Sequence, residues 1–97
     1  MPLGYWVVYL EVSDPEGYKV YQAFVSPFLA ANGGRFLVRG GQTEVVEGTV
    51  KPRVVIIEFD SFEEARRVYH SMEYQEGRAL RLGRSSGNVA IVEGIEG

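Results

Sequence analysis

His70 is the one side chain of this sequence that titrates near neutral pH without help from its surroundings, and it is the only histidine. Arg66 precedes it by four residues, so on a helix both side chains lie along one edge. Such a pair could supply a general acid or base and a contact for a substrate anion. The alternative is that the negative end of the helix dipole simply favours a histidine in the last turn. We therefore treat His70 as a candidate catalytic residue and Arg66 as a candidate substrate contact.

Arg35 and Arg39 are the next candidates, because they flank Leu37 in a segment with strand character. Strand alternation predicts that both point to the same face, and Arg53 begins a neighbouring strand. Guanidinium groups gathered there could hold a carboxylate or phosphate through paired hydrogen bonds. The alternative is that they form ion pairs with nearby glutamates or keep a strand edge from aggregating.

Three aromatic residues, Trp6, Tyr69 and Tyr74, could line an apolar substrate pocket. They could equally belong to the core or to contacts between two copies of the chain. A buried tyrosine needs a hydrogen-bond partner for its hydroxyl, so these side chains are natural neighbours for His70 or an arginine.

The residue inventory predicts no tightly bound metal, flavin or nucleotide. The chain has no cysteine and one histidine, which excludes thiolate zinc sites and sites with several histidines. Gly33-Gly34 is expected to end a helix, and Gly40-Gly41 to form a β-bulge rather than an anion-binding loop, because neither enters a helix. Haem held by His70 as a single axial ligand is the alternative that stays open.

Composition limits the class of protein. Ninety-seven residues make one domain, spanning residues 1–97, and 45% hydrophobic residues exclude a disordered chain. No apolar run approaches the roughly 20 residues of a membrane span. The net charge of −3 argues against nucleic-acid binding. With no targeting segment apparent, the expected location is the cytoplasm.

The first half of the chain should place these residues on a strand, a helix and a second strand. Gly4–Val12 is rich in aromatic and β-branched residues, which predicts a strand. Asp14-Pro15-Glu16 is typical of a helix start, and Pro27 predicts a kink or restart near Ser26. Arg35–Arg39 is a predicted strand that continues extended through residues 42–47.

The second half repeats the pattern. Arg53–Phe59 is a predicted strand, and Ser61 with Glu64 forms a capping-box signature for a helix to about His70. A short helix over residues 72–82 and a strand over residues 88–93 follow. The order β-α-β-β-α-β predicts a ferredoxin-like α+β sandwich, with helices on one face of a four-stranded antiparallel sheet.

The predicted strands are apolar on both faces. In the first strand, Tyr5, Val7 and Tyr9 alternate with Trp6 and Val8. A sheet face that met water would be polar, and an open apolar face exceeds what soluble monomers usually expose. We therefore expect a homodimer that packs sheet against sheet.

Several short segments also carry a resemblance to a known family. They are Gly4-Tyr5-Trp6, Asp14-Pro15-Glu16 with Tyr18 and Tyr21, residues 33–41, Ile57-Glu58-Phe59 with Ser61-Phe62-Glu63, Tyr69-His70-Ser71, Glu73-Tyr74-Gln75 and Val92-Glu93-Gly94. This pattern resembles Domain of Unknown Function 1330, within the dimeric α/β barrel superfamily, although Met72 stands where that family usually has proline. The resemblance implies a ferredoxin-like protomer that pairs into an eight-stranded barrel.

Two functions fit these observations. The first is an enzyme or binding protein for a small aromatic or anionic metabolite, held in a pocket between the helices and the sheet without a tightly bound cofactor. The alternative is a non-catalytic dimeric module that binds a ligand or another protein. An RNA-binding use of the sheet is disfavoured by the acidic charge and by the expected dimer.

Overall fold

The computed structural model describes residues 2–96 and has the predicted ferredoxin-like α+β fold. Asp14 caps the first helix by accepting a hydrogen bond from the amide of Gly17 at 3.1 Å, and Ser61 caps the second through Glu64. The elements are β1 (Gly4–Val12), α1 (Pro15–Ala31), β2 (Arg35–Arg39), β3 (Arg53–Phe59), α2 (Phe62–His70), α3 (Met72–Arg78) and β4 (Ser85–Glu93).

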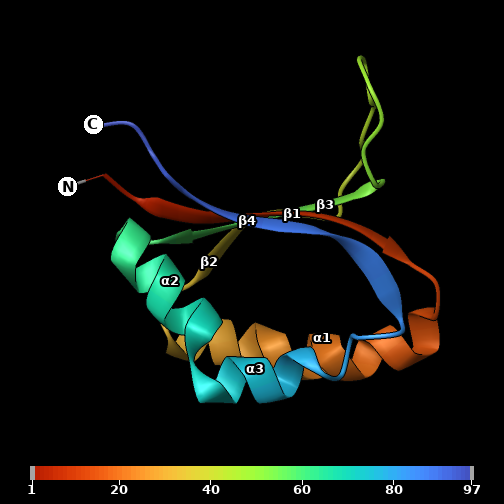
Figure 1. Ribbon diagram of the computed structural model, residues 1–97, viewed down its shortest axis with the longest axis horizontal. Coiled ribbons are helices and arrows are strands. Elements are labelled where there is room, and N and C mark those ends of the chain that lie inside the picture. Colours follow the sequence, from red (N-terminus) through yellow and green to blue (C-terminus); the bar gives the residue numbers. More distant parts are fainter. Residues whose placement is uncertain (1, 97) are drawn as a thin grey trace.

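The sheet has the strand order β2-β3-β1-β4, and every pair of neighbours is antiparallel. All three helices lie on one side of the sheet (Figure 1). The result is a two-layer sandwich whose other sheet face is not covered by any helix. Within the described part of the chain, no helix has the length and apolar character needed to cross a membrane.

Two predicted boundaries are wrong, and one of two alternatives is settled. Helix α1 continues through Pro27, so of the kink or restart expected near Ser26 the restart is not found. Helix α3 ends at Arg78 instead of residue 82, because the next turns use shorter i to i−3 hydrogen bonds, such as that from the amide of Arg81 to the carbonyl of Arg78. Strand β4 begins at Ser85 instead of residue 88, since its first residues pair with the end of β1.

The largest difference concerns the segment after β2. Residues 42–47 do not extend the strand; with their neighbours they form an irregular arm, residues 41–50, in which every residue is exposed. In Figure 1 this yellow-green arm rises from the sheet on the side opposite the helices. The expected bulge is present, but it lies at Leu37, where the pairing of β2 with β3 shifts by one residue, and not at Gly40-Gly41.

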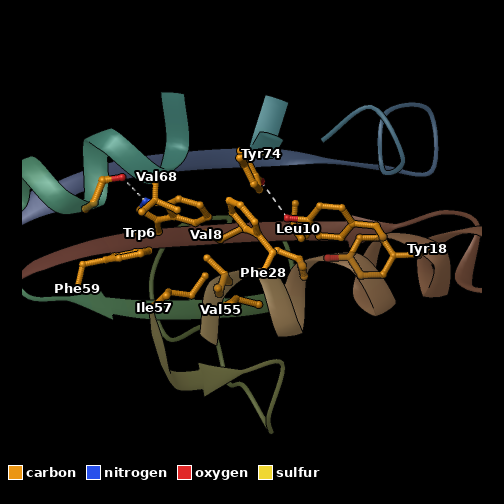
Figure 2. Packing of buried hydrophobic residues seen from close by; sticks show 14 residues of the cluster. Trp6, Val8, Leu10, Tyr18, Phe28, Val55, Ile57, Phe59, Val68 and Tyr74 are labelled. Carbon is orange, nitrogen blue, oxygen red and sulfur yellow. Dashed lines mark hydrogen bonds between the residues drawn. The ribbon is translucent and has the colours of Figure 1, made fainter. Parts of the chain in front are cut away.

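The hydrophobic core lies between the helices and the sheet (Figure 2). Trp6 is its central aromatic residue and is only 2% exposed. Its indole nitrogen donates a hydrogen bond to the carbonyl oxygen of Ala65 in α2 at 2.9 Å, drawn as a dashed line in Figure 2. The other buried hydrophobic residues are Val8, Leu10, Tyr18, Tyr21, Val25, Phe28, Leu29, Val55, Ile57, Phe59, Ala65, Val68 and Tyr74.

The alternation predicted for β1 and β3 is confirmed. Trp6, Val8 and Leu10 point to the helices, while the residues between them are half-buried on the open face. There, Val7 stands between Ile56 of β3 and Ala90 of β4. The open face of the sheet is therefore apolar at its centre.

Candidate functional site

A narrow cavity of about 40 Å³ lies between α1 and the helix-facing side of the sheet. Its walls are mostly apolar, and its polar groups are tyrosines, one glutamine and arginines. The lining residues are Trp6, Val8, Leu10, Tyr18, Tyr21, Gln22, Val25, Leu29, Phe36, Arg39, Arg53, Val55, Ile57, Tyr74, Arg81 and Val89.

A wider groove of about 390 Å³ adjoins this cavity. The two share Leu10, Tyr18, Gln22 and Arg53, which therefore mark the passage between them. The groove is bounded by the start of α1 and by Gly40 and Pro52, which flank the arm on either side. Because the inner cavity holds only a few atoms, a bound organic molecule would extend from it into the groove.

Arg53 occupies this passage. Its guanidinium carbon lies 5.9 Å from the centre of the Tyr18 ring, and its buried Nε atom has no hydrogen-bond partner among residues 2–96. Gly40 makes room for the guanidinium: it has a φ of 70°, and a β-carbon there would overlap Nη1 of Arg53. A buried donor without a partner is unfavourable, so a ligand that accepts a hydrogen bond here would be stabilised.

Arg81 forms a second polar centre with two tyrosines. Its side chain is 9% exposed, and its guanidinium carbon lies 5.7 Å from the centre of the Tyr21 ring. The hydroxyl oxygens of Tyr21 and Tyr74 are 2.9 Å apart and share a hydrogen bond. Through these contacts, the segment after α3 packs against α1 at the wall of the cavity.

The cavity has a positive electrostatic character. Arg39, Arg53 and Arg81 line it, no aspartate or glutamate does, and none of the three forms an ion pair within residues 2–96. Arg39 instead lies over the Phe36 ring at 4.2 Å and donates to the hydroxyl of Ser26. Unpaired guanidinium groups around an apolar space favour an anion.

Burial raises the pKa of the Tyr21 phenol above its ordinary value, and the neighbouring Tyr74 phenol adds to the rise. Burial likewise raises the pKa of Tyr18, although the positive charge of Arg53 opposes it. Both phenols therefore stay protonated at neutral pH and act as hydrogen-bond donors rather than as bases.

The raised pKa of Tyr21 predicts a loss of stability in alkali. The folded protein holds the phenolic proton more tightly than the unfolded chain. The free energy of unfolding is therefore unaffected by this group below about pH 10 and declines as the pH rises further, by up to about 1.4 kcal/mol per pH unit. Tyr21→Phe should show a shallower decline in the free energy of unfolding, measured by urea titration between about pH 9 and about pH 11. Equal slopes for both proteins would contradict this assignment.

The structure brings three of the predicted site residues to the cavity: Trp6, Tyr74 and Arg39. Tyr69 packs behind them, with its ring 5.5 Å from that of Trp6. Arg35 does not join them, because the bulge at Leu37 reverses the alternation of β2. Its side chain lies on the open face and binds Glu58, so the expectation that it points the same way as Arg39 is wrong.

His70 and Arg66 are exposed on α2 and line neither the cavity nor the groove. The predicted meeting of His70 with an arginine-lined pocket is therefore not found in the protomer; the His70 ring instead packs edge-on against the Tyr69 ring, with 5.3 Å between their centres. Within residues 2–96, no group of histidine and acidic side chains is arranged to hold a metal ion.

The sequence pattern did not mark Tyr18, Tyr21, Gln22 or Arg81 as site residues. The two tyrosines carry the helical spacing of a buried stripe, and that spacing does not distinguish a core from a cavity wall. A signal for Arg81 was present, because it follows Tyr74 by seven residues, or two helical turns.

Comparisons with known proteins agree with this architecture. The family model described as Domain of unknown function (DUF1330) matches residues 3–95. No curated protein matches the sequence. Among solved structures, a protein of unknown function from Rhodopseudomonas palustris is similar with a TM-score of 0.73 and 14% identity, over 99% of this chain and 85% of that one.

Two further structures share the fold. A candidate antibiotic biosynthesis monooxygenase from Caulobacter crescentus has a TM-score of 0.60 and 16% identity, over 98% of this chain and 92% of its own. An ethyl tert-butyl ether d (EthD) family protein from Bacillus halodurans has a TM-score of 0.56 and 12% identity, over 99% of both chains. At these identities the likeness establishes the fold alone.

Proposed function

The chain belongs to the DUF1330 family, and from this premise and the geometry of its cavity we propose that it binds a small organic anion with an apolar body. The observation that carries the proposal is the set of guanidinium groups of Arg39, Arg53 and Arg81 around an apolar space that no carboxylate lines. The free Nε of Arg53 supports a carboxylate or similar oxyanion at the passage to the groove.

The apolar walls select the rest of the ligand. Trp6, Val25 and Leu29 bound the inner cavity, so a short alkyl group or the edge of a flat ring would be buried there favourably. The anionic group would lie at Arg53, where the cavity opens into the groove. A ligand of this kind would match both the apolar walls and the guanidinium groups without a cofactor.

The lining favours binding and electrostatic stabilisation over general base catalysis. Within residues 2–96, no histidine, aspartate or glutamate lines the cavity, and burial keeps the phenols of Tyr18 and Tyr21 protonated. A reaction carried out here would be one in which the guanidinium groups stabilise an oxyanion that forms on the substrate. The likeness to the candidate monooxygenase from Caulobacter crescentus is compatible with such chemistry but concerns the fold.

A non-catalytic binding module is the second candidate function. It is favoured by the exposed position of His70, the only side chain with an ordinary pKa near neutrality. The same cavity would then hold its ligand without transforming it.

The proposal also includes a homodimer that buries the open face of the sheet. Half-buried Tyr5, Val7 and Tyr9 of β1 form the centre of that face, with Val54 and Ile56 of β3 beside them. No helix in the described part of the chain covers it (Figure 1). A second copy would remove this apolar surface from water.

Arg53→Met tests the ligand site. A charge-assisted hydrogen bond contributes about 1.5–3 kcal/mol, so the variant should bind a simple apolar carboxylate such as phenylacetate about 10- to 150-fold more weakly. Isothermal titration calorimetry of the wild-type chain and the variant measures the difference.

Arg66→Met is the matched control, because Arg66 is exposed on α2 and lies outside the cavity. It should bind phenylacetate as the wild-type chain does. Equal weakening by both substitutions would show that the anion is held by the general surface charge and not by this cavity.

A further inference from the structure

We propose that the arm, residues 41–50, packs against the β4 edge of a second copy of this chain. The proposal rests on the homodimer proposed above and goes beyond it, because it names the segment and the strand edge that meet. The arm is an irregular segment that leaves the sandwich on the side of the open sheet face, as the short segment after β4 also does (Figure 1).

The three valines of the arm are exposed in the protomer. Val46 is 80% exposed, and Val45 and Val50 are exposed as well. Its ends are held to the sheet: the amide of Gly40 donates to the carbonyl of Val54, and Lys51 forms an ion pair with Glu11. A projecting segment that carries three exposed valines is suited to a partner surface.

The exposed apolar side chains of the molecule gather around the arm and the two edges of the sheet. Of the ten exposed large hydrophobic residues within residues 2–96, seven lie there, whereas the helical layer and the turn after it carry the other three. The seven are Leu37 and Val38 of β2, Val45, Val46 and Val50 of the arm, Val92 of β4 and Ile95 after it. The partner surface therefore lies along these edges and not on the helices.

The β4 edge is the surface that most needs a partner. The strand is nine residues long and pairs on one side only, with β1. Glu93 is the single charged residue within it. Long edge strands with few charges are prone to pair with other chains unless something covers them.

Symmetry brings the arm to this edge. If two sheets meet through their open faces about a two-fold axis parallel to the strands, the β2 side of one sheet lies beside the β4 side of the other. The arm follows β2, so each copy would lay its arm along the β4 edge of its partner. Both exposed edges are then closed by the same contact, as in a barrel.

This contact would also shape the ligand site. Gly40 and Pro52, which flank the arm, line the groove at the mouth of the cavity. Docking of the arm on a second copy would fix these ends in place. The groove of each protomer would therefore be complete only in the dimer.

Val46→Asp tests the arm, with Val20→Asp as its matched control. Val20 is an equally simple exposed valine, 52% exposed on α1 in the helical layer. Sedimentation velocity over a dilution series should show that Val46→Asp raises the dimer dissociation constant at least about tenfold and that Val20→Asp leaves it unchanged. Circular dichroism verifies that both variants are folded.

Two results would overturn the proposal in different ways. A Val46→Asp protein that dimerises as the wild-type chain does removes the arm from the interface and leaves the dimer standing. A wild-type chain that stays monomeric at every concentration would contradict both the arm contact and the homodimer. The ligand titrations with Arg53→Met would remain a separate test of the ligand site.

Because the chain has no cysteine, Val46→Cys provides a single site for a photoreactive benzophenone label. Irradiation of a mixture of ¹⁴N- and ¹⁵N-labelled protein, followed by mass spectrometry, separates links between copies from links within one. Links between copies to residues 85–93 are expected. Links that stay within one copy, or that reach the helices, would contradict the proposal.

Discussion

Replacing Trp6 with alanine is expected to lower the free energy of unfolding by about 4 kcal/mol. The side chain is 2% exposed and packs against the rings of Phe59, Tyr69 and Tyr74 at 5.0–5.5 Å. Its removal leaves a cavity among these rings and breaks the hydrogen bond to Ala65. A domain of this size has only about 5–15 kcal/mol of stability in total, so the midpoint temperature should fall on the order of 20 °C.

Trp6→Phe separates the two parts of this effect. Phenylalanine retains most of the ring packing but cannot donate to the Ala65 carbonyl, so the expected loss is about 1.5 kcal/mol. Urea unfolding of the wild-type chain and both variants gives the comparison. A loss below about 1 kcal/mol for Trp6→Ala would show that Trp6 does not hold the helices to the sheet.

Placing a charge on either face of β1 should give two opposite results. Val7 and Val8 are adjacent valines, but Val8 is buried in the core and Val7 lies on the open face. Val8→Asp should unfold the protein, because an unpaired buried charge is destabilising by several kcal/mol. Val7→Asp should leave a folded monomer and raise the dimer dissociation constant by about 100-fold or more, since the charge would be buried only at the interface.

Circular dichroism and sedimentation velocity distinguish these outcomes. A folded Val8→Asp protein would mean that the two faces of β1 have been exchanged. A Val7→Asp protein that dimerises normally would mean that the open face is not the dimer interface, and the arm could then not complete the groove through that face.

Local sequence signals predict most of the fold. Asp14, Pro15 and Ser61 determine where α1 and α2 begin through their own short-range hydrogen bonds and backbone geometry, so they can be recognised without the structure. The alternation in β1 predicts which side chains face the helices because a strand has only two faces.

The candidate site was less predictable, because it depends on one irregular residue and on distant contacts. The bulge at Leu37 has no sequence signature, yet it sends Arg35 and Arg39 to opposite faces of the sheet. Similarly, residues 42–47 were expected to continue extended after β2, since Thr43, Val45 and Val46 favour strands; the structure shows that no partner strand pairs with them in the protomer.

His70 illustrates a different limit. Its position on the helix was predicted correctly, but a helix period does not tell which edge faces a cavity when the helix is short and the cavity lies against another one. The arginines that do reach the cavity come from β2, β3 and the chain after α3, segments that are far apart in the sequence.

We propose that the cavity between the helices and the sheet holds an anion with an apolar body. Calorimetric titration of the wild-type chain with phenylacetate and with phenylacetamide, which have the same shape but differ in charge, tests this directly. The carboxylate should bind at least about tenfold more tightly than the amide, because both can accept a hydrogen bond from Arg53 but only the carboxylate carries a negative charge that complements its guanidinium. Equal affinities, or tighter binding of the amide, would contradict it.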